Sequence, residues 1–269
     1  MDTVPEWGFQ SFYVASAVCF ISSAIFVKVS ISAAIFLLSS PSLDRPIKLF
    51  PQHGFQKKSF KNADDSTSPY VVFVPHSYDG KKEFPVILFL HGAGETKGGS
   101  KEPVLVGIGP AIEKQKKTFP FIAIIPQAEK FGWGADTANG KRAVAMLDEV
   151  LKEYKTDAKR VYLTGLSMGG MGTFSLAAAH PDRWAAIVPI CGRGDVKTAE
   201  KFKDIPCWCF HGDADTSVVV AGSRDMMEAL KKAGGTPKYT EYPKVGHNSW
   251  DMAYGEKEFF PWLLEQKRK

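Results

Sequence analysis

From residue 70 onward, short apolar runs alternate with stretches of helical periodicity, and this alternation limits the fold more than any other feature of the sequence. Most of the runs are continuously apolar, which is typical of strands that are covered on both faces. The predicted strands are 70–75, 85–91, 121–126, 160–165, 185–191 and 207–212, with a weaker one at 238–243.

Two stretches between these runs predict helices. Residues 224–234 end on glycines that suit a helix C-cap. Residues 139–154 place aliphatic side chains on one face, namely Val144, Leu147, Val150 and Leu151. Strands alternating with helices predict an α/β fold with a mostly parallel, doubly covered sheet. Ligands bind such sheets at the carboxyl ends of the strands, so functional residues are expected directly after strands.

The chain has 269 residues, 44% of them hydrophobic, which suits one α/β core but not two ordinary domains and a membrane anchor. The net charge is +5, but basic and acidic residues are mixed, so nucleic-acid binding is not expected. The sequence contains no dinucleotide motif, P-loop, EF-hand or paired C-x-x-C, so neither an organic cofactor nor a metal is expected. Cys191, Cys207 and Cys209 are expected to be buried free thiols.

Residues 12–40 are almost wholly apolar or small and are interrupted only by Lys28. About 20 such residues can span a bilayer, but a lysine near the middle of a span costs about 2.5 kcal/mol or more. Alternatively, Lys28 is the charged region of a secretory signal peptide that continues with VSISAAIFLL and SSPS, and Val27 is the true initiator. We therefore predict a targeting or membrane segment over residues 1–40, and a secreted, periplasmic or membrane-anchored protein.

Residues 41–66 are rich in Pro, Lys, Ser and Asp. This composition favours a linker or an irregular lead-in strand. The folded domain is therefore predicted over residues 67–269.

The sequence LTGLSMGG at 163–170 places Ser167 among glycines, between a predicted strand and a predicted helix. This is the context of a nucleophile elbow, in which glycines remove Cβ clashes from a tight turn. A plain strand-to-helix turn is the alternative, but it explains neither the serine nor the density of glycine. Ser167 is therefore the predicted nucleophile.

A nucleophilic serine needs a base and a carboxylate that orients the base, and in this fold the chain order is serine, acid, histidine. Among the later histidines, His180 ends a helix and His211 ends a strand, whereas His247 lies in a late loop and is the predicted base. The acid follows the strand that ends near His211, where HGDADTSVV offers Asp213 and Asp215. These residues alone leave that choice open.

The tetrahedral intermediate of acyl transfer needs hydrogen-bond donors for its oxyanion, and losing one typically costs about 2.7 to 4 kcal/mol. One donor is expected to be the backbone N–H of Met168, the residue after the nucleophile. The second is expected from the small residues of the loop that follows the strand 85–91, beginning at His91.

In chain order, the motifs HGAGE, GLSMGG, HGDADTSVV and GHNSWD of residues 70–269 resemble the α/β-hydrolase superfamily. More narrowly, they are similar to small esterases near feruloyl and acetylxylan esterases, polyhydroxybutyrate depolymerase-like proteins and dienelactone hydrolases. The resemblance implies Ser167 as nucleophile and His247 as base. It selects Asp215 as the acid through the pattern H-G-x-x-D, and the N–H groups of Ala93 and Met168 as oxyanion donors.

The predicted strands ending at Cys191 and beginning at Cys207 are separated by a short connection. A cap domain is therefore not expected, and the site is predicted to be open. Trp133 and Trp250 are candidates to line it, with core packing as the alternative for both.

The resemblance implies a serine carboxylesterase that hydrolyses small-molecule or polymer-linked esters, including carbohydrate-linked acyl groups, through an acyl-enzyme without a cofactor. A serine peptidase or an acyltransferase with the same triad is the alternative among enzymes. A non-catalytic ligand-binding protein on a hydrolase scaffold is the alternative of another class.

Overall fold

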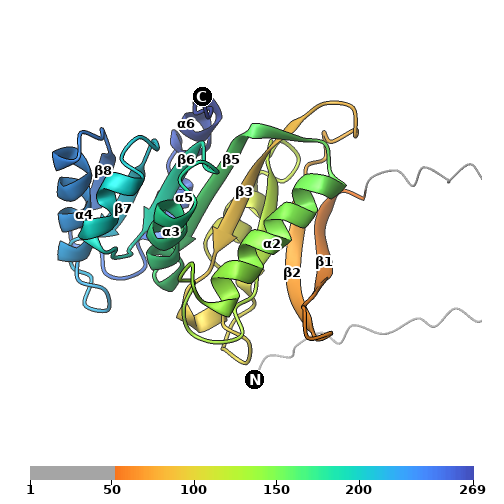
Figure 1. Ribbon diagram of the computed structural model, residues 1–269, viewed down its shortest axis with the longest axis horizontal. Coiled ribbons are helices and arrows are strands. Elements are labelled where there is room, and N and C mark those ends of the chain that lie inside the picture. The colour runs from red at the N-terminus through yellow and green to blue at the C-terminus, as the bar shows by residue number, and fades with distance from the viewer. Residues whose placement is uncertain (1–51) are drawn as a thin grey trace, which may run out of the picture. The chain divides into compact units, whose positions relative to one another are not determined.

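A single eight-stranded sheet organises residues 52–269, the part of the chain that the computed structural model describes (Figure 1). The strand order is β1-β2-β4-β3-β5-β6-β7-β8. The pairs β1–β2 and β2–β4 are antiparallel, and all later neighbours are parallel. The strands are β1 (Gly54–Lys61), β2 (Thr67–Val74), β3 (Phe84–Leu90), β4 (Ile122–Pro126), β5 (Thr156–Leu166), β6 (Ala186–Ile190), β7 (Trp208–Gly212) and β8 (Lys238–Tyr242).

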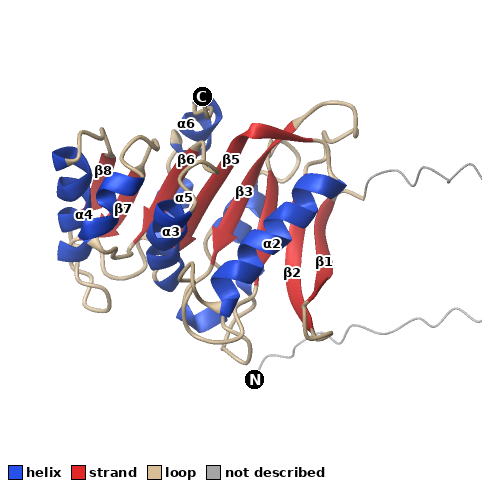
Figure 2. Ribbon diagram, in the orientation of Figure 1, coloured by secondary structure: helices blue, strands red, loops and turns tan. Residues whose placement is uncertain are grey.

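Helices cover both faces of the sheet, which confirms the predicted α/β architecture (Figure 2). They are α1 (Ile108–Lys114), α2 (Ala138–Glu153), α3 (Met168–Ala179), α4 (Ala221–Lys232), α5 (Trp250–Gly255) and α6 (Phe259–Glu265). Helices α2, α3 and α4 pack into one core layer, and α1, α5 and α6 pack into the other.

Strand β3 shows why the apolar runs are continuous. Val86, Leu88 and Leu90 point into the first core layer, whereas Ile87 and Phe89 point into the second. Successive side chains of a strand alternate between faces, so a strand covered on both faces must be apolar at every position. All of the predicted strands and both predicted helices are present, and Gly234 has the positive φ of +92° that a glycine C-cap requires.

The first strand bears on the two alternatives predicted for residues 41–66, a linker or an irregular lead-in strand. Residues 54–61 form a regular edge strand that pairs with β2 from Gly54 opposite Val74 to Lys61 opposite Thr67. One side of this strand is exposed, so polar and basic residues are tolerated there, and lysines discourage pairing with another chain. Residues 54–61 are therefore a lead-in strand, regular rather than irregular, and the sheet begins at Gly54 rather than at residue 67.

The predictions for residues 1–40, and for the linker up to residue 51, lie outside the described residues. Within residues 52–269, no helix combines the length and apolar character needed to cross a bilayer. The connection from β6 to β7 contains only a short 3-10 turn, η3 (Val196–Lys201), and no cap domain. Cys191, Cys207 and Cys209 are buried free thiols, as expected.

Candidate active site

Ser167 lies between the last residue of β5 and the first residue of α3, with φ +53° and ψ −116°. A non-glycine residue with positive φ is strained by roughly 1 to 3 kcal/mol and is held there by its surroundings. Close packing supplies that constraint, because a Cβ at Gly169 would lie 1.9 Å from the carbonyl oxygen of Leu90, and one at Gly165 would lie 2.5 Å from the carbonyl oxygen of Gly169. The glycines around Ser167 therefore allow the turn to form.

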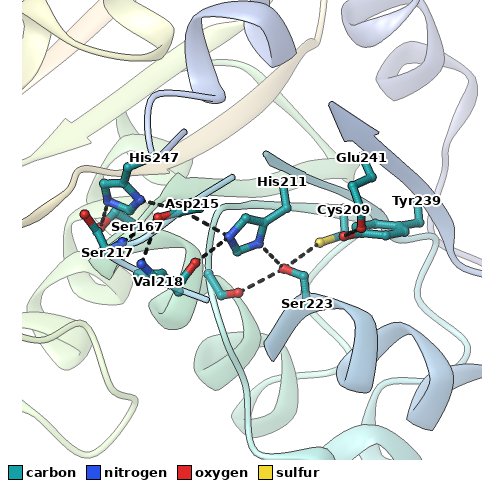
Figure 3. Close-up of polar contacts among 11 residues, drawn as sticks. Ser167, Cys209, His211, Asp215, Ser217, Val218, Ser223, Tyr239, Glu241 and His247 are labelled. Carbon is teal, nitrogen blue, oxygen red and sulfur yellow. Dashed lines mark hydrogen bonds and ion pairs between the residues drawn. The ribbon is translucent and has the colours of Figure 1, made fainter. Parts of the chain in front are cut away.

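Three loops at the carboxyl ends of parallel strands bring Ser167, Asp215 and His247 together (Figure 3). Nε2 of His247 lies 2.9 Å from Oγ of Ser167, and Nδ1 of His247 lies 2.7 Å from Oδ2 of Asp215. Because a carboxylate only accepts hydrogen bonds, Nδ1 carries the proton, and Nε2 is left to accept from the serine hydroxyl. This is the geometry that general-base activation of a serine requires.

Asp215 is buried, and its other oxygen, Oδ1, accepts hydrogen bonds from the backbone N–H groups of Ser217 (2.8 Å) and Val218 (2.9 Å). Burial acts to raise the pKa of Asp215, but the hydrogen bonds from His247, Val218 and Ser217 outweigh it and lower the pKa overall. The group is therefore held as a carboxylate at neutral pH.

Asp213, the other acid that the sequence offered, has a different role. Its side chain is exposed, and its Oδ1 accepts a hydrogen bond from the backbone N–H of Lys244 at 2.6 Å. It therefore closes a turn through a backbone contact, as aspartates often do. The geometry thus separates the two acids, because only Asp215 contacts His247.

The loop after β3 lies against the nucleophile. A Cβ at Gly92 would lie 3.7 Å from the Cβ of Ser167, and Ala93 lines the same cavity as Ser167 and Met168. Met168 is the first residue of α3, where backbone N–H groups have no partner within the helix and the helix dipole favours negative charge. Both residues predicted as oxyanion donors therefore border Ser167.

His91 contacts this loop from the core side. It is completely buried, its Nε2 accepts a hydrogen bond from the backbone N–H of Ala128 at 2.9 Å, and its Nδ1 lies 2.6 Å from the carbonyl oxygen of Gly92. The first contact fixes the ring as the tautomer with its proton on Nδ1, which can then donate to Gly92. Burial lowers the pKa of His91 to about 4.

The two tryptophans that were candidates to line the cleft have different positions in the structure. Trp133 is only 2% exposed, packs in the core edge-on to His91, and donates from Nε1 to the carbonyl oxygen of His91 at 2.9 Å. Its core position satisfies both the apolar ring and the indole N–H, so the expectation for Trp133 is corrected. Trp250 does line the catalytic cavity, with its ring edge-on to His247 at a centroid distance of 5.4 Å.

The cavity above Ser167 has a volume of about 590 Å³. Its walls include residues that sequence reasoning did not identify: Glu95, Phe131, Met171, Arg193 and Val219. Phe131 and Val219 are 71% and 68% exposed, so the rim of the cavity presents apolar surface to solvent. Both lie in loops that the sequence had already marked, because Phe131 is two residues before Trp133 and Val219 is the last residue of the motif HGDADTSVV.

Cys191 has a ligand atom within 4.8 Å of those of Asp215 and His247, which makes this trio a candidate metal site among the described residues. Burial raises the pKa of Cys191 to about 12, so the thiol stays protonated at neutral pH, whereas metals bind the thiolate. The side chains of Asp215 and His247 are already hydrogen-bonded to each other. The trio therefore does not fit a resident metal.

Comparisons with known proteins agree with this architecture. The chain is 28% identical over 118 residues to acetylxylan esterase A of Emericella nidulans, a match that covers 40% of this chain and 35% of that one. It is 24% identical over 186 residues to feruloyl esterase D of Neurospora crassa, covering 65% and 62% of the two chains. Because the chain spans well under half of the acetylxylan esterase, that relative does not by itself assign an activity to this protein.

Among solved structures, a thermostable esterase superposes with a TM-score of 0.72 at 33% identity, covering 80% of this chain and 63% of that one. The feruloyl esterase module from Clostridium thermocellum, solved with sinapinate, has a TM-score of 0.61 at 18% identity and shares the fold. The family model described as "Dienelactone hydrolase family" matches residues 54–251, more than half of the chain. The protein therefore belongs to the dienelactone hydrolase family, with the α/β-hydrolase fold.

Proposed function

We propose that the protein is a serine carboxylesterase with Ser167 as nucleophile, His247 as general base and Asp215 as the carboxylate that orients His247. The observation that carries the proposal is the continuous hydrogen-bonded chain from Ser167 Oγ through His247 to Asp215, at the floor of an open cavity. Its relatives with esterase names support the reaction class.

In the first half of the reaction, the Oγ–H bond of Ser167 breaks as the proton moves to Nε2 of His247, and a new bond forms between Oγ and the ester carbonyl carbon. The resulting oxyanion accepts hydrogen bonds from the N–H groups of Ala93 and Met168. Collapse breaks the bond from that carbon to the alcohol oxygen, and His247 returns its proton to the leaving alkoxide. The alcohol departs, and the acyl group stays on Ser167.

In the second half, His247 removes a proton from water, and the oxygen of that water attacks the acyl carbon. The bond to Oγ breaks, the proton passes from Nε2 to Ser167, and the carboxylic acid leaves. The lowered pKa of Asp215 supports both halves, because a carboxylate stabilises the imidazolium that forms twice in each turnover.

The cavity favours esters with a bulky or polymeric component. No cap domain covers Ser167 in the described residues, and the exposed side chains of Phe131 and Val219 provide an apolar rim. Small-molecule esters and acyl groups carried on carbohydrate or other polymers are therefore the proposed substrates. Relatives named for acetylxylan and feruloyl esters fit this class.

An ester panel tests the proposal directly. The purified protein would be assayed on p-nitrophenyl acetate and butyrate, methyl ferulate and acetylated xylo-oligosaccharides, beside a peptide p-nitroanilide and reactions with an added acceptor alcohol. We expect ester hydrolysis with kcat on the order of 1 to 1000 per second on the best substrate. Faster cleavage of the peptide than of any ester would identify a peptidase. Acyl transfer to the alcohol in preference to water would identify an acyltransferase. Tight ester binding without turnover would indicate a binding protein.

We also propose that the N-terminal segment directs export, on the basis of the apolar sequence on either side of Lys28. N-terminal sequencing of the native protein tests this proposal. A mature chain that begins downstream of Ile31 supports a cleaved signal peptide, whereas one that begins upstream of Ile31 contradicts it.

A further inference from the structure

We propose that His211 is a positioning residue for the reaction: it holds the catalytic carboxylate of Asp215 from the side opposite His247. The inference rests on the proposed function and adds to it a second histidine that takes no part in proton transfer. In the sequence, His211 stood out only as a rival for the role of base.

His211 lies in β7, is completely buried, and reaches Asp215 from within the core (Figure 3). Its Nε2 is 3.1 Å from Oδ2 of Asp215 and 2.8 Å from the carbonyl oxygen of Val218. Both partners are acceptors, so Nε2 must carry a proton and donate. The ring thus bridges the two ends of the short loop that presents Asp215.

With His211 in place, the carboxylate of Asp215 has four donors around it. Oδ1 accepts from the N–H groups of Ser217 and Val218, and Oδ2 accepts from His247 and His211. A carboxylate has about four acceptor sites, so this one is saturated. Without His211, Oδ2 would be held by His247 alone, and His247 is the residue that the carboxylate must itself orient.

The other ring nitrogen also has a polar neighbour in the core. Nδ1 of His211 lies 2.7 Å from the hydroxyl oxygen of Ser223, a buried residue of α4. The Ser223 oxygen is 2.9 Å from the carbonyl oxygen of Gly192 and accepts from the thiol of Cys209 at 3.4 Å. The hydroxyl has one proton, which it donates either to the carbonyl oxygen of Gly192 or to Nδ1, so one of these two contacts is a hydrogen bond at a time, and in either arrangement Nε2 keeps its own proton.

The contact between Ser223 and Gly192 connects the loop that carries Asp215 to the region around Ser167. Gly192 packs against the first turn of α3, where its Cβ, if present, would lie 2.5 Å from the carbonyl carbon of Gly170. The path from Asp215 through His211 and Ser223 to Gly192 therefore ends against the helix that begins directly after Ser167. The arrangement sets the acid and the nucleophile in a fixed relation, which transition-state stabilisation requires.

Two substitutions at His211 distinguish a role in positioning Asp215 from a role in core packing alone. Glutamine can place its amide N–H near the position of Nε2 and donate to Asp215, whereas asparagine is too short and can reach only toward Ser223. Hydrogen bonds to charged groups are among the stronger ones in proteins, so the loss of this donor should be measurable. We therefore expect His211→Asn to lower kcat by about 10-fold or more with KM changed less than about twofold, and His211→Gln to keep kcat within about threefold of the wild type.

Phe210→Leu is the matched control, because Phe210 is buried in the same strand but points into the opposite core layer. It should lower the melting temperature as much as His211→Asn does while leaving kcat per active site unchanged. Active sites would be counted by end-point labelling with a fluorophosphonate. Equal kcat values for His211→Asn and His211→Gln, or a loss of kcat in Phe210→Leu that matches its loss of stability, would overturn the proposal.

A spectroscopic measurement keeps the test independent of turnover and of the proposed function. The downfield proton resonance of His247 Nδ1–H reports its hydrogen bond to Oδ2 of Asp215. With one donor removed, the carboxylate of Asp215 is no longer held in position against His247, so that bond weakens and the resonance should move upfield in His211→Asn and remain near the wild-type position in His211→Gln. An unchanged resonance in folded His211→Asn overturns the positioning role. If the wild type hydrolyses no ester, it is the proposed function that fails, and the resonance still tests the role of His211.

Discussion

Nε2 of His247 lies 2.9 Å from Oγ of Ser167, although the two residues are 80 positions apart in the chain. The sheet order explains the contact: β5, β6, β7 and β8 are parallel neighbours in sequence order, so the loops after β5, β7 and β8 open on the same edge. Each loop contributes one of the three hydrogen-bonded residues Ser167, Asp215 and His247.

Asp215→Asn should lower kcat by about 1000- to 10,000-fold, because an amide can donate to His247 and favours the wrong tautomer of the ring. Steady-state kinetics on the best ester measure the loss. Asp213→Asn is the matched control, since Asp213 is exposed and contacts only the turn at Lys244, and it should change kcat less than about threefold. A larger loss in Asp213→Asn than in Asp215→Asn would assign the acid to Asp213.

The free energy of unfolding should fall as the pH drops from 6.5 toward 4, because His91 is buried with its pKa lowered to about 4 from the ordinary 6.5. In this window the unfolded chain binds a proton at His91 and the folded chain does not, so each pH unit costs about 1.4 kcal/mol of stability. Above pH 6.5 both states hold His91 neutral, and this contribution to the pH dependence vanishes.

Denaturant unfolding at pH 7 and pH 5 measures that dependence in the wild type and in His91→Gln. Glutamine can still accept from the N–H of Ala128 but does not titrate, so the variant should lose less stability between the two pH values. An equal loss in both proteins would show that His91 does not resist protonation in the folded state.

Gly169→Ala should destabilise the fold by several kcal/mol or prevent folding. The added Cβ would lie 1.9 Å from the carbonyl oxygen of Leu90, and relieving this clash requires the backbone of β3 or α3 to move. Gly255→Ala is the control: nothing lies within 4 Å of its added Cβ, and the free energy of unfolding should change by less than about 1 kcal/mol. Thermal unfolding of both variants checks the prediction. A Gly169→Ala protein as stable as the wild type would contradict the tight elbow.

Trp250→Ala should change substrate specificity, whereas Trp133→Ala should lower the free energy of unfolding. Trp250 lines the catalytic cavity, so its loss should lower kcat/KM progressively more as the acyl or alcohol group of the ester becomes larger. Trp133 is in the core, and its loss should cost about 3 to 5 kcal/mol of stability. Kinetics on a graded ester series and thermal unfolding separate the two. If Trp133→Ala also changed kcat/KM progressively with ester size, Trp133 would be a cleft residue rather than a core residue.

The central strands β3, β4, β6 and β7 could be predicted because both of their faces are buried, which leaves continuous apolar runs in the sequence, whereas β8 is partly exposed and gave a weaker signal. Strand β1 was only one of two alternatives for its residues, because an edge strand with one exposed side tolerates the lysines and serines of a linker. The order of the site motifs likewise predicted which residues meet. The burial of Trp133 and the contact of His211 with Asp215 depend on how loops fold, and local sequence does not encode such long-range contacts.

If Ser167 carries the acyl group, a fluorophosphonate should label it covalently, and intact-protein mass measurement detects that label. We expect one label per wild-type chain at Ser167 and none in Ser167→Ala, with ester hydrolysis lost in proportion to labelling. A Ser167→Ala protein that still takes up the label, or a wild type that hydrolyses esters without being labelled, would contradict this role for Ser167.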